Sequence, residues 1–535
     1  MLNNIKSILD LIKWYFRTEK LRIRGNFLFD KTLIISELNT SLATIKVNAI
    51  YASCLKKKGY KAFIIFKSKE FLYEQYYRCV GVYSFIYLDT RPTSEKSKMV
   101  NKILKQSNSS ENFLKFNLNG INIGKWIASR IVREQKVGEF EIEKFDKSKL
   151  ISYISESVNA LYTIKTILDS KKNCSIIFNE RGYSPCGEIF EYCLKNKVNT
   201  VQWFGSPLDN HHSYKRYIES NKDYHPLSLS NKSFKYLLNH KRANFFEKQV
   251  LSHLEKQYRE KKWFNRQNLE KEKKIYSKNE IVKKLNLNPK KKTAVIFSHI
   301  MYDATFFYGE SIFKNYKLWL KETLKLAEKN ENINWLLKIH PANKWRNEIE
   351  QNDHKTLEED LVDDLYKKLP KNMFVLKPDS DISTYSLFSF IDYGLTVRGT
   401  VGCELSCFGI PVFTAGTGRY SHQGFTIDSE NKKSYENKIK NIHKYSKLSR
   451  ERTKKARIFT YGSIMARSIP MDGIIIKYNL KTFLSSYHTD VKFEKISIDK
   501  LIKKLDINLF VDWFDNNELK ESDRDLMYVK KSKCD

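Results

Sequence analysis

The sequence predicts an α/β protein with two Rossmann-type doubly wound domains facing a central cleft. Three observations support this prediction. Short apolar runs alternate with helical segments, which is typical of βαβ units with parallel strands. The chain has 535 residues, too many for one compact core. Its polar clusters follow the apolar runs, where ligands bind in such sheets.

The first predicted domain covers residues 1–242. Its opening segment, 1–24, repeats apolar residues with a helical period and carries lysines between them, so we expect an amphipathic helix. That helix packs either on an anionic bilayer or on its own domain, and the sequence leaves both alternatives open. The runs KTLIISEL and KAFIIF flank a helical segment in one βαβ unit, and the same pattern recurs at 174–204.

A charged helical segment, 243–290, is the predicted connection between the domains. SKNE at 277–280 is a capping-box signature, and Pro289 ends the helix because it disfavours helical backbone at Asn288. We expect the charged residues of this segment to lie on a solvated surface. The second predicted domain, 291–480, begins with the strand in KTAVIFSHI and continues with further strand–helix alternation.

The formal net charge of +34 favours an anionic partner: nucleic acid, a membrane surface or an acidic glycan. Biased genome composition is the alternative explanation, because lysine is abundant throughout the chain. The eight cysteines form no CxxC pair, which is typical of reduced thiols in the cytosol. The first residues do not resemble a signal peptide, since Lys6, Asp10 and Lys13 interrupt them. We expect a cytoplasmic protein without a spanning helix.

The stretch TVRGTVGCEL places polar residues after a predicted strand at 393–397. Arg398 and Gly399 form a turn, and Thr400 is positioned to cap a helix at 401–408. A helix start and an arginine both favour a bound phosphate. Glu404 lies one turn further on and is suited to accept hydrogen bonds from a sugar diol. An ordinary cap followed by an ordinary first-turn glutamate is the alternative.

The stretch LLKIHPANKW ends another apolar run with Lys338, His340 and Pro341. Lys338 lies two residues before His340, so both side chains project from the same face of the strand. His340 can donate to a phosphate or a base carbonyl, and Pro341 fixes the turn that aims it. A purely structural histidine is the alternative.

Two acidic triplets, Asp379–Asp381 and Asp523–Asp525, resemble metal-binding DxD pairs but have no obvious third ligand. We therefore expect turn and surface roles for them and predict no metal site. Walker-type, HExxH and GxSxG motifs are absent from the sequence.

These residues together give the chain a resemblance to a known group. FSHIMYDATFF, LLKIHPANKW and the stretch from PDSDISTYSL to SHQGFT resemble bacterial capsule and surface-polysaccharide biosynthesis proteins, which are GT-B glycosyltransferases. The Lys-x-His-Pro element is similar to the HP motif of bacterial sialyl-, polysialyl- and Kdo-transferases. It is also similar to a motif of CDP-glycerol glycerophosphotransferases. NERGYSPCGEIF and VQWFGSP resemble this group more loosely.

The resemblance implies a nucleotide-sugar donor site in the second domain and an acceptor site in the first. The residues that it assigns to the donor nucleotide are Ser298, His299, Lys338, His340, Pro341, Arg398, Gly399, Thr400 and Glu404. It implies no cofactor and no catalytic metal, since basic residues neutralise the leaving phosphate. It also implies that 481–535 packs back on the first domain as helices.

A catalytic base, if the enzyme inverts the anomeric centre, is expected at a strand end of the first domain. Glu180 is the first candidate because it follows strand 174–178 directly. Asp209, His211 and His212 follow the next strand, and Asp303 is the candidate from the facing domain. Desolvation in a closed cleft raises the pKa of a carboxylate toward a useful value.

The predicted function is glycosyl transfer to a growing capsular or surface polysaccharide, or to a lipid-linked glycan. The partners expected are the nucleotide sugar, that acceptor, capsule assembly proteins and the anionic inner face of the cytoplasmic membrane. Three alternatives remain: a CDP-alcohol-dependent polyol-phosphate transferase, a non-catalytic capsule scaffold and a nucleic-acid-binding protein. The last would interleave basic and aromatic residues in one module, and the basic residues here are spread out, so we predict no nucleic-acid partner.

Overall fold

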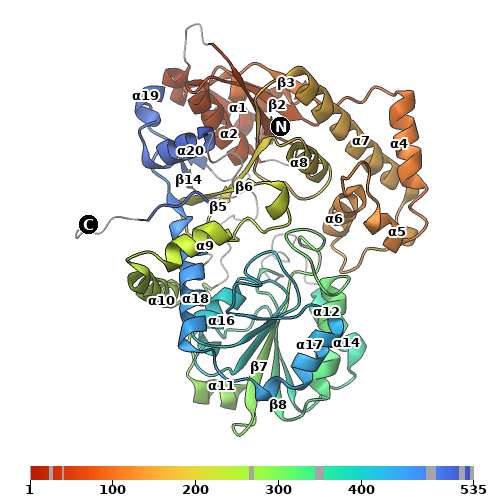
Figure 1. Cartoon of the computed structure of the whole chain (residues 1–535), viewed down its shortest axis with the longest axis vertical. Coiled ribbons are helices and arrows are strands. Elements are labelled where there is room, and N and C mark those ends of the chain that lie inside the picture. Colours follow the sequence, from red (N-terminus) through yellow and green to blue (C-terminus); the bar gives the residue numbers. More distant parts are fainter. Residues whose placement is uncertain are drawn as a thin grey trace.

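The chain forms two α/β domains, each built on one sheet with helices around it (Figure 1). This arrangement confirms the predicted fold class. In the computed structural model the described residues are 2–22, 28–38, 41–263, 270–343, 355–477, 490–516 and 525–529.

The sheet of the first domain has the strand order β13-β6-β5-β4-β1-β2-β3. Strands β1 to β5 run parallel, and β6 and β13 are antiparallel to their neighbours. Most residues of the central strands are buried because helices cover both faces of the sheet. The strands are β1 (Lys31–Ser36), β2 (Tyr60–Phe66), β3 (Phe85–Tyr87), β4 (Cys174–Phe178), β5 (Asn199–Gly205), β6 (His211–Tyr217) and β13 (Ile469–Pro470).

The helices of the first domain mostly begin at polar caps that the sequence supplies, but those that start at Phe71 and Cys186 have no capping side-chain hydrogen bond. The Ser41 side chain, for example, accepts a hydrogen bond from Thr44 N at the start of α2. These helices are α1 (Leu2–Arg17), α2 (Leu42–Lys56), α3 (Phe71–Arg78), α4 (Ser94–Leu104), α5 (Ser110–Lys115), α6 (Ile123–Gln135), α7 (Lys147–Ser170) and α8 (Cys186–Lys195).

The sheet of the second domain is parallel throughout, with the order β12-β11-β10-β7-β8-β9. Chain order reverses between β7 and β10, and this switch point is where doubly wound sheets bind ligands. The strands are β7 (Lys292–Phe297), β8 (Ile333–Lys338), β9 (Met373–Leu376), β10 (Tyr393–Thr396), β11 (Val412–Thr414) and β12 (Ile427–Asp428). The helices are α11 (Lys278–Lys284), α12 (Tyr316–Glu328), α14 (Leu357–Leu365), α15 (Thr384–Leu387), α16 (Val401–Cys407) and α17 (Lys432–Lys440).

The segment expected to be a solvated connection is largely part of the core of the second domain. Helix α10 (Ala243–Arg259) lies beside α18 (Arg450–Thr460), and α9 (Asn231–Leu238) packs on the same helix (Figure 1). Phe246, Val250 and Leu254 are fully buried in one cluster with residues of β7 and α16. Their spacing of four residues forms one apolar helix face, which the intervening charges conceal in the sequence.

The chain returns to the first domain through β13. Ile469 pairs with His212 of β6, so the crossing lies before the boundary expected at 480. The later helices α19 (Ile498–Leu501) and α20 (Leu505–Asp515) pack on α2 in the core of the first domain.

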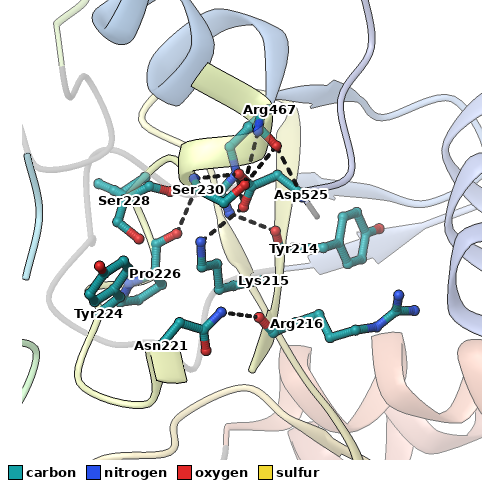
Figure 2. Close-up of polar contacts among 12 residues, drawn as sticks. Tyr214, Lys215, Arg216, Asn221, Tyr224, Pro226, Ser228, Ser230, Arg467 and Asp525 are labelled. Atoms are coloured by element: carbon teal, nitrogen blue, oxygen red, sulfur yellow. Dashed lines mark hydrogen bonds and ion pairs between the residues drawn. The ribbon is translucent and has the colours of Figure 1, made fainter. Parts of the chain in front are cut away.

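A buried ion cluster fixes the end of the described chain to the first domain (Figure 2). Asp525 lies 3.0 Å from Lys215 of β6 and 3.4 Å from Arg467, and it accepts a hydrogen bond from Ser230 N. All three charged side chains are fully buried. The surface role expected for the triplet 523–525 is therefore wrong for Asp525, while Asp523 lies outside the described residues.

Helix α1 packs on its own domain with one face only. Trp14 is buried, donates to the Tyr76 carbonyl and lies beside Lys46, which pairs with Asp10. The opposite face is exposed and apolar, with Ile8, Leu9, Ile12, Tyr15 and Phe16 each between 47% and 59% exposed. No helix in the described parts of the chain is long and apolar enough to cross a bilayer.

Candidate functional site

A pocket of about 650 Å³ lies in the cleft between the domains, where the carboxyl ends of strands from both sheets meet. Every residue expected to bind a nucleotide lines it, and so do Glu180 and Asp303. The predicted residues that line it are Glu180, Ser298, His299, Asp303, Lys338, His340, Pro341, Arg398, Gly399, Thr400 and Glu404. The fold thus brings together residues that are more than 200 positions apart.

Asp209 and His211 do not line this pocket. After β5 the chain turns back into antiparallel β6, so Asp209 lies in the turn between the two strands and His211 is the first residue of β6. Neither residue is therefore at a parallel strand end. His212 is fully buried beside the Tyr51 hydroxyl, and burial lowers its pKa to about 3, so it is neutral. The antiparallel turn is the feature that the sequence pattern missed.

Buried polar residues behind the pocket hold the His340 turn. The His340 N–H donates to Ser298 Oγ at 3.0 Å, and the Ala342 N–H donates to His340 Nδ1 at 3.2 Å. Since Nδ1 accepts this hydrogen bond, the ring proton of a neutral His340 is on Nε2. Glu358 and Asn343 support Ser298 from behind.

Two arginines at the pocket have buried N–H groups without a hydrogen-bond partner in the described part of the chain. Arg398 is 4% exposed and donates from Nη1 to the Phe307 carbonyl at 3.4 Å, but its Nε and Nη2 have no hydrogen-bond partner within the described residues. Arg419 lies 2.5 Å from His225 through Nη2, and its Nε likewise has none there. Guanidinium groups whose buried N–H groups have no acceptor are suited to bind an anion.

His299 fixes the backbone that carries Arg398. Its Nε2 lies 3.0 Å from the Thr396 hydroxyl and accepts from the N–H groups of Val397 and Arg398. Its ring stacks on Tyr316 with centroids 4.6 Å apart. Burial, together with the charge of Arg398, holds the pKa of His299 well below its usual range, so the ring is neutral. His299 therefore acts here as a hydrogen-bond acceptor for the Arg398 turn.

Thr400 does not cap α16, in contrast to the expectation, because its backbone is already helical and its side chain makes no capping hydrogen bond. Glu404 is buried and accepts a hydrogen bond from Tyr258 Oη at 2.5 Å. Burial raises the pKa of Glu404 to about 7, although hydrogen bonds from Tyr258 and Thr400 act in the opposite direction. Tyr258 comes from α10, and the sequence missed it because α10 was taken for a solvated helix.

Lys338 is 5% exposed at the floor of the pocket. Its Nζ has no hydrogen-bond or ion-pair partner within the part of the chain that the structure describes. The pKa of Lys338 is lowered to about 8, mainly by burial and also by the charge of Lys273, while the charge of Glu270 acts in the opposite direction. An ammonium group in this position is suited to donate to an acceptor on a ligand.

The two candidate bases differ in their surroundings. Glu180 Oε1 accepts hydrogen bonds from Gly182 N at 2.8 Å and from Tyr308 Oη at 3.0 Å, and burial raises its pKa. Asp303 forms an ion pair with Arg133 at 2.6 Å and accepts from the Tyr183 hydroxyl at 2.9 Å. Asp303 is thus engaged in a contact between the domains.

In the described residues, no group of three or more His, Cys, Asp or Glu side chains is arranged to hold a metal ion. The pocket instead gathers cationic and neutral hydrogen-bond donors opposite a few buried carboxylates. Such a set of side chains fits an anionic ligand that also carries hydroxyl groups.

No protein-family model and no curated protein matches the chain. Among solved structures, it is similar to KpsC from Thermosulfurimonas dismutans, a β-Kdo 2,4 transferase (12% identity, 62% of this chain, 88% of that chain, TM-score 0.30). It is also similar to UDP-GlcNAc 2-epimerase from Neisseria meningitidis (11%, 81%, 98%, TM-score 0.25). A glycosyltransferase from Rickettsia africae is a third similar structure (11%, 85%, 96%, TM-score 0.26). Similarities at this level identify no equivalent residues.

Proposed function

We propose that this protein is a glycosyltransferase that moves a sugar from a nucleotide-sugar donor to a growing capsular or surface polysaccharide or a lipid-linked glycan. The observation that carries the proposal is a pair of arginines, Arg398 and Arg419, whose buried N–H groups have no partner within the described residues and which line the same pocket as the Glu180 carboxylate. The phosphate of a nucleotide sugar would accept hydrogen bonds from these arginines. The sugar would then lie on the side of the pocket that carries the Glu180 carboxylate.

The nucleotide binds on the second domain. Arg398 and Arg419 donate to the phosphate, and His340 donates from Nε2. The Lys338 ammonium group donates a hydrogen bond to an acceptor on the nucleotide. This hydrogen bond offsets the free-energy cost of burying the ammonium group. Glu404 accepts hydrogen bonds from a sugar diol.

The reaction needs one bond formed, one bond broken and one proton moved. In an inverting transfer the acceptor hydroxyl attacks the anomeric carbon, and the bond from that carbon to the phosphate oxygen breaks. The leaving nucleotide keeps the electron pair, and the guanidinium groups of Arg398 and Arg419 stabilise its charge. Glu180 takes the hydroxyl proton, for which its raised pKa is suited.

Glu180 is preferred to Asp303 as the base for a physical reason. Asp303 is neutralised by Arg133 at 2.6 Å. Glu180 lies in the pocket wall, and both hydrogen bonds that it accepts within the described residues go to the same oxygen, Oε1. Metal independence is part of the proposal, and turnover that persists in excess chelator would support it.

The exposed apolar face of α1 is proposed to lie on an anionic bilayer, which would place the enzyme at the inner face of the cytoplasmic membrane. Ile8, Ile12 and Phe16 are all about half exposed, and the exposed Lys13 and Lys20 lie near them. Apolar side chains with basic neighbours fit the boundary between anionic headgroups and acyl chains. A lipid-linked acceptor would be met at this surface.

The proposed function is tested by nucleotide release. Purified protein is incubated with CMP-, UDP- and GDP-sugars and with CDP-glycerol, each with and without a glycan acceptor. Acceptor-dependent release from one nucleotide sugar is expected, and Glu180→Gln should lower it at least a hundredfold. Glu188→Gln, which changes a buried glutamate outside the pocket, is the control. Release from CDP-glycerol alone would indicate polyol-phosphate transfer, and binding of DNA without any release would contradict the proposal.

A further inference from the structure

The loop that follows β7, residues 298–315, leaves the second domain and packs into the first. Phe307 lies against Trp126 and Tyr183, with ring centroids 5.7 and 4.9 Å apart. A Cβ atom on Gly182 would lie 2.2 Å from the Phe307 ring, so only glycine fits at that position. The loop therefore anchors the second domain inside the core of the first.

Tyr308, in this loop, has an unusual backbone conformation. Its φ of 64° is in the left-handed region, which is rare for a bulky aromatic residue. Gly309 follows with a φ of 117°, and a Cβ atom on Gly418 would lie 2.3 Å from the Tyr308 carbonyl oxygen. The two chain segments thus cross in close contact. Strained backbone that packing maintains is commonly found at functional sites.

From this position the Tyr308 side chain reaches across the cleft to Glu180. Its Oη donates to Glu180 Oε1 at 3.0 Å, the same oxygen that accepts from Gly182 N at 2.8 Å. The Tyr308 ring is fixed between His225 and the Arg181 guanidinium, with separations of 4.9 and 4.7 Å. Within the described residues Glu180 Oε2 has no hydrogen-bond partner, so one oxygen is anchored twice and the other is available.

We propose that Tyr308 is a positioning residue, which holds Oε1 of Glu180 from the opposite domain so that Oε2 alone meets the acceptor hydroxyl. This inference rests on the proposed function of the pocket. Because Tyr308 belongs to the nucleotide-binding domain, the carboxylate is aligned only when the two domains are together. Arg398 donates to the carbonyl of Phe307, the residue before Tyr308, which links the phosphate site to the same loop.

The contact has a consequence for the pH dependence of Glu180. The titratable and charged groups that face Glu180 are Arg133, Arg181, Tyr183, Cys186, Tyr217, Asp303 and Tyr308. Burial raises the pKa of Glu180, whereas the hydrogen bonds from Gly182 and Tyr308 lower it by favouring the carboxylate. Removing the Tyr308 hydroxyl must therefore raise this pKa further, and the acidic limb of the rate profile must move to higher pH.

The kinetic test compares Tyr308→Phe with Tyr183→Phe. Both changes remove a hydroxyl that crosses between the domains, but the Tyr183 hydroxyl contacts Asp303 and Ala304 and not Glu180. Tyr308→Phe should lower kcat about tenfold, change the donor KM less than about twofold and move the acidic limb up by about one pH unit. Tyr183→Phe should leave the acidic limb in place. Equal effects of both variants on kcat and on the limb would overturn the positioning role.

A second measurement needs no turnover. In protein with ¹³C-labelled glutamate, the Glu180 carboxyl signal is assigned by its loss in Glu180→Gln, and its titration is followed with and without the Tyr308→Phe change. An upward move of the midpoint by about one unit is expected. An unchanged midpoint would overturn the inference even in an active enzyme. A moved midpoint in a protein that consumes no nucleotide sugar would support the contact and contradict only the proposed function.

Discussion

The Ser298 hydroxyl donates to Glu358 Oε1 at 3.2 Å, directly behind the turn that carries His340. The same hydroxyl accepts from the His340 N–H, and Asn343 donates to the same carboxyl oxygen at 3.0 Å. Glu358 is 1% exposed, and burial raises its pKa to about 7. A buried carboxyl group thus supports the pocket without lining it.

Glu358 should make folding stability depend on pH. The pKa of Glu358 is about 7 in the folded chain and 4.5 without burial. Between pH 4.5 and 7 the unfolded state is ionised while the folded state keeps the proton, so the free energy of unfolding falls as pH rises. Glu358→Gln keeps a hydrogen-bond acceptor but does not ionise. We expect it to add about 2 to 3 kcal/mol of stability at pH 8 and little at pH 5, measured by denaturant unfolding. An equal effect at both pH values would contradict this, and exposed Glu451→Gln is the control.

Lys338→Met should stabilise the protein and weaken nucleotide binding. The pKa of Lys338 is about 8 in the folded protein and 10.5 without burial. At pH 7 the buried ammonium group therefore lowers the free energy of unfolding, and this loss disappears as pH rises from 8 to 10.5. Methionine of similar length should therefore raise the Tm of the free protein, while nucleotide affinity falls about tenfold or more. A lower Tm or an unchanged affinity would argue against the assigned role. Lys325→Met, on the exposed side of α12, is the control.

Asp525→Asn should destabilise the first domain. It removes the negative charge beside Lys215 and Arg467, which are both fully buried (Figure 2). Breaking a buried pair in this way costs about 3 to 5 kcal/mol, because the remaining charges stay uncompensated. Denaturant unfolding measures the effect, with exposed Asp499→Asn as the control. A loss below about 1 kcal/mol would show that water or other groups compensate the cations.

The exposed face of α1 should bind anionic vesicles. In co-sedimentation with phosphatidylglycerol vesicles, the combined change Ile8→Ser, Ile12→Ser and Phe16→Ser should reduce binding at least tenfold, because it removes the apolar side chains that the bilayer would bury. Wild-type protein should bind neutral phosphatidylcholine vesicles much more weakly. Ile151→Ser, an exposed apolar residue on α7, should have no effect. Unchanged binding of the triple variant would assign the interaction to basic residues elsewhere.

The sequence was informative where local pattern determines structure. The apolar runs around Ile34 and Ile296 predict buried parallel strands because both faces of those strands are covered, and polar residues at such strand ends share one edge of the sheet. This is why the residues predicted from the loops at 298–299, 338–341 and 398–404 line one pocket.

Long-range packing was less accessible from the sequence. The role of Tyr258 depends on α10 folding onto α18, which no local pattern specifies. Arg419 was missed because it belongs to AGTGRY, whose glycines are a weak signal, and only its proximity to Arg398 gives it a role. Asp209 and His211 were misplaced because a hairpin and a parallel crossover look alike at the end of β5.

The most direct test of the account is titration calorimetry of CMP, CDP, UDP and GDP into wild-type protein and into Arg398→Gln. The unpaired guanidinium N–H groups predict that at least one nucleotide binds the wild type and that Arg398→Gln weakens it about tenfold or more, with the Tm of the free variant nearly unchanged. Binding that is equal in both proteins would contradict the phosphate site. The absence of binding by any nucleotide to the folded wild type would contradict the proposed transferase itself.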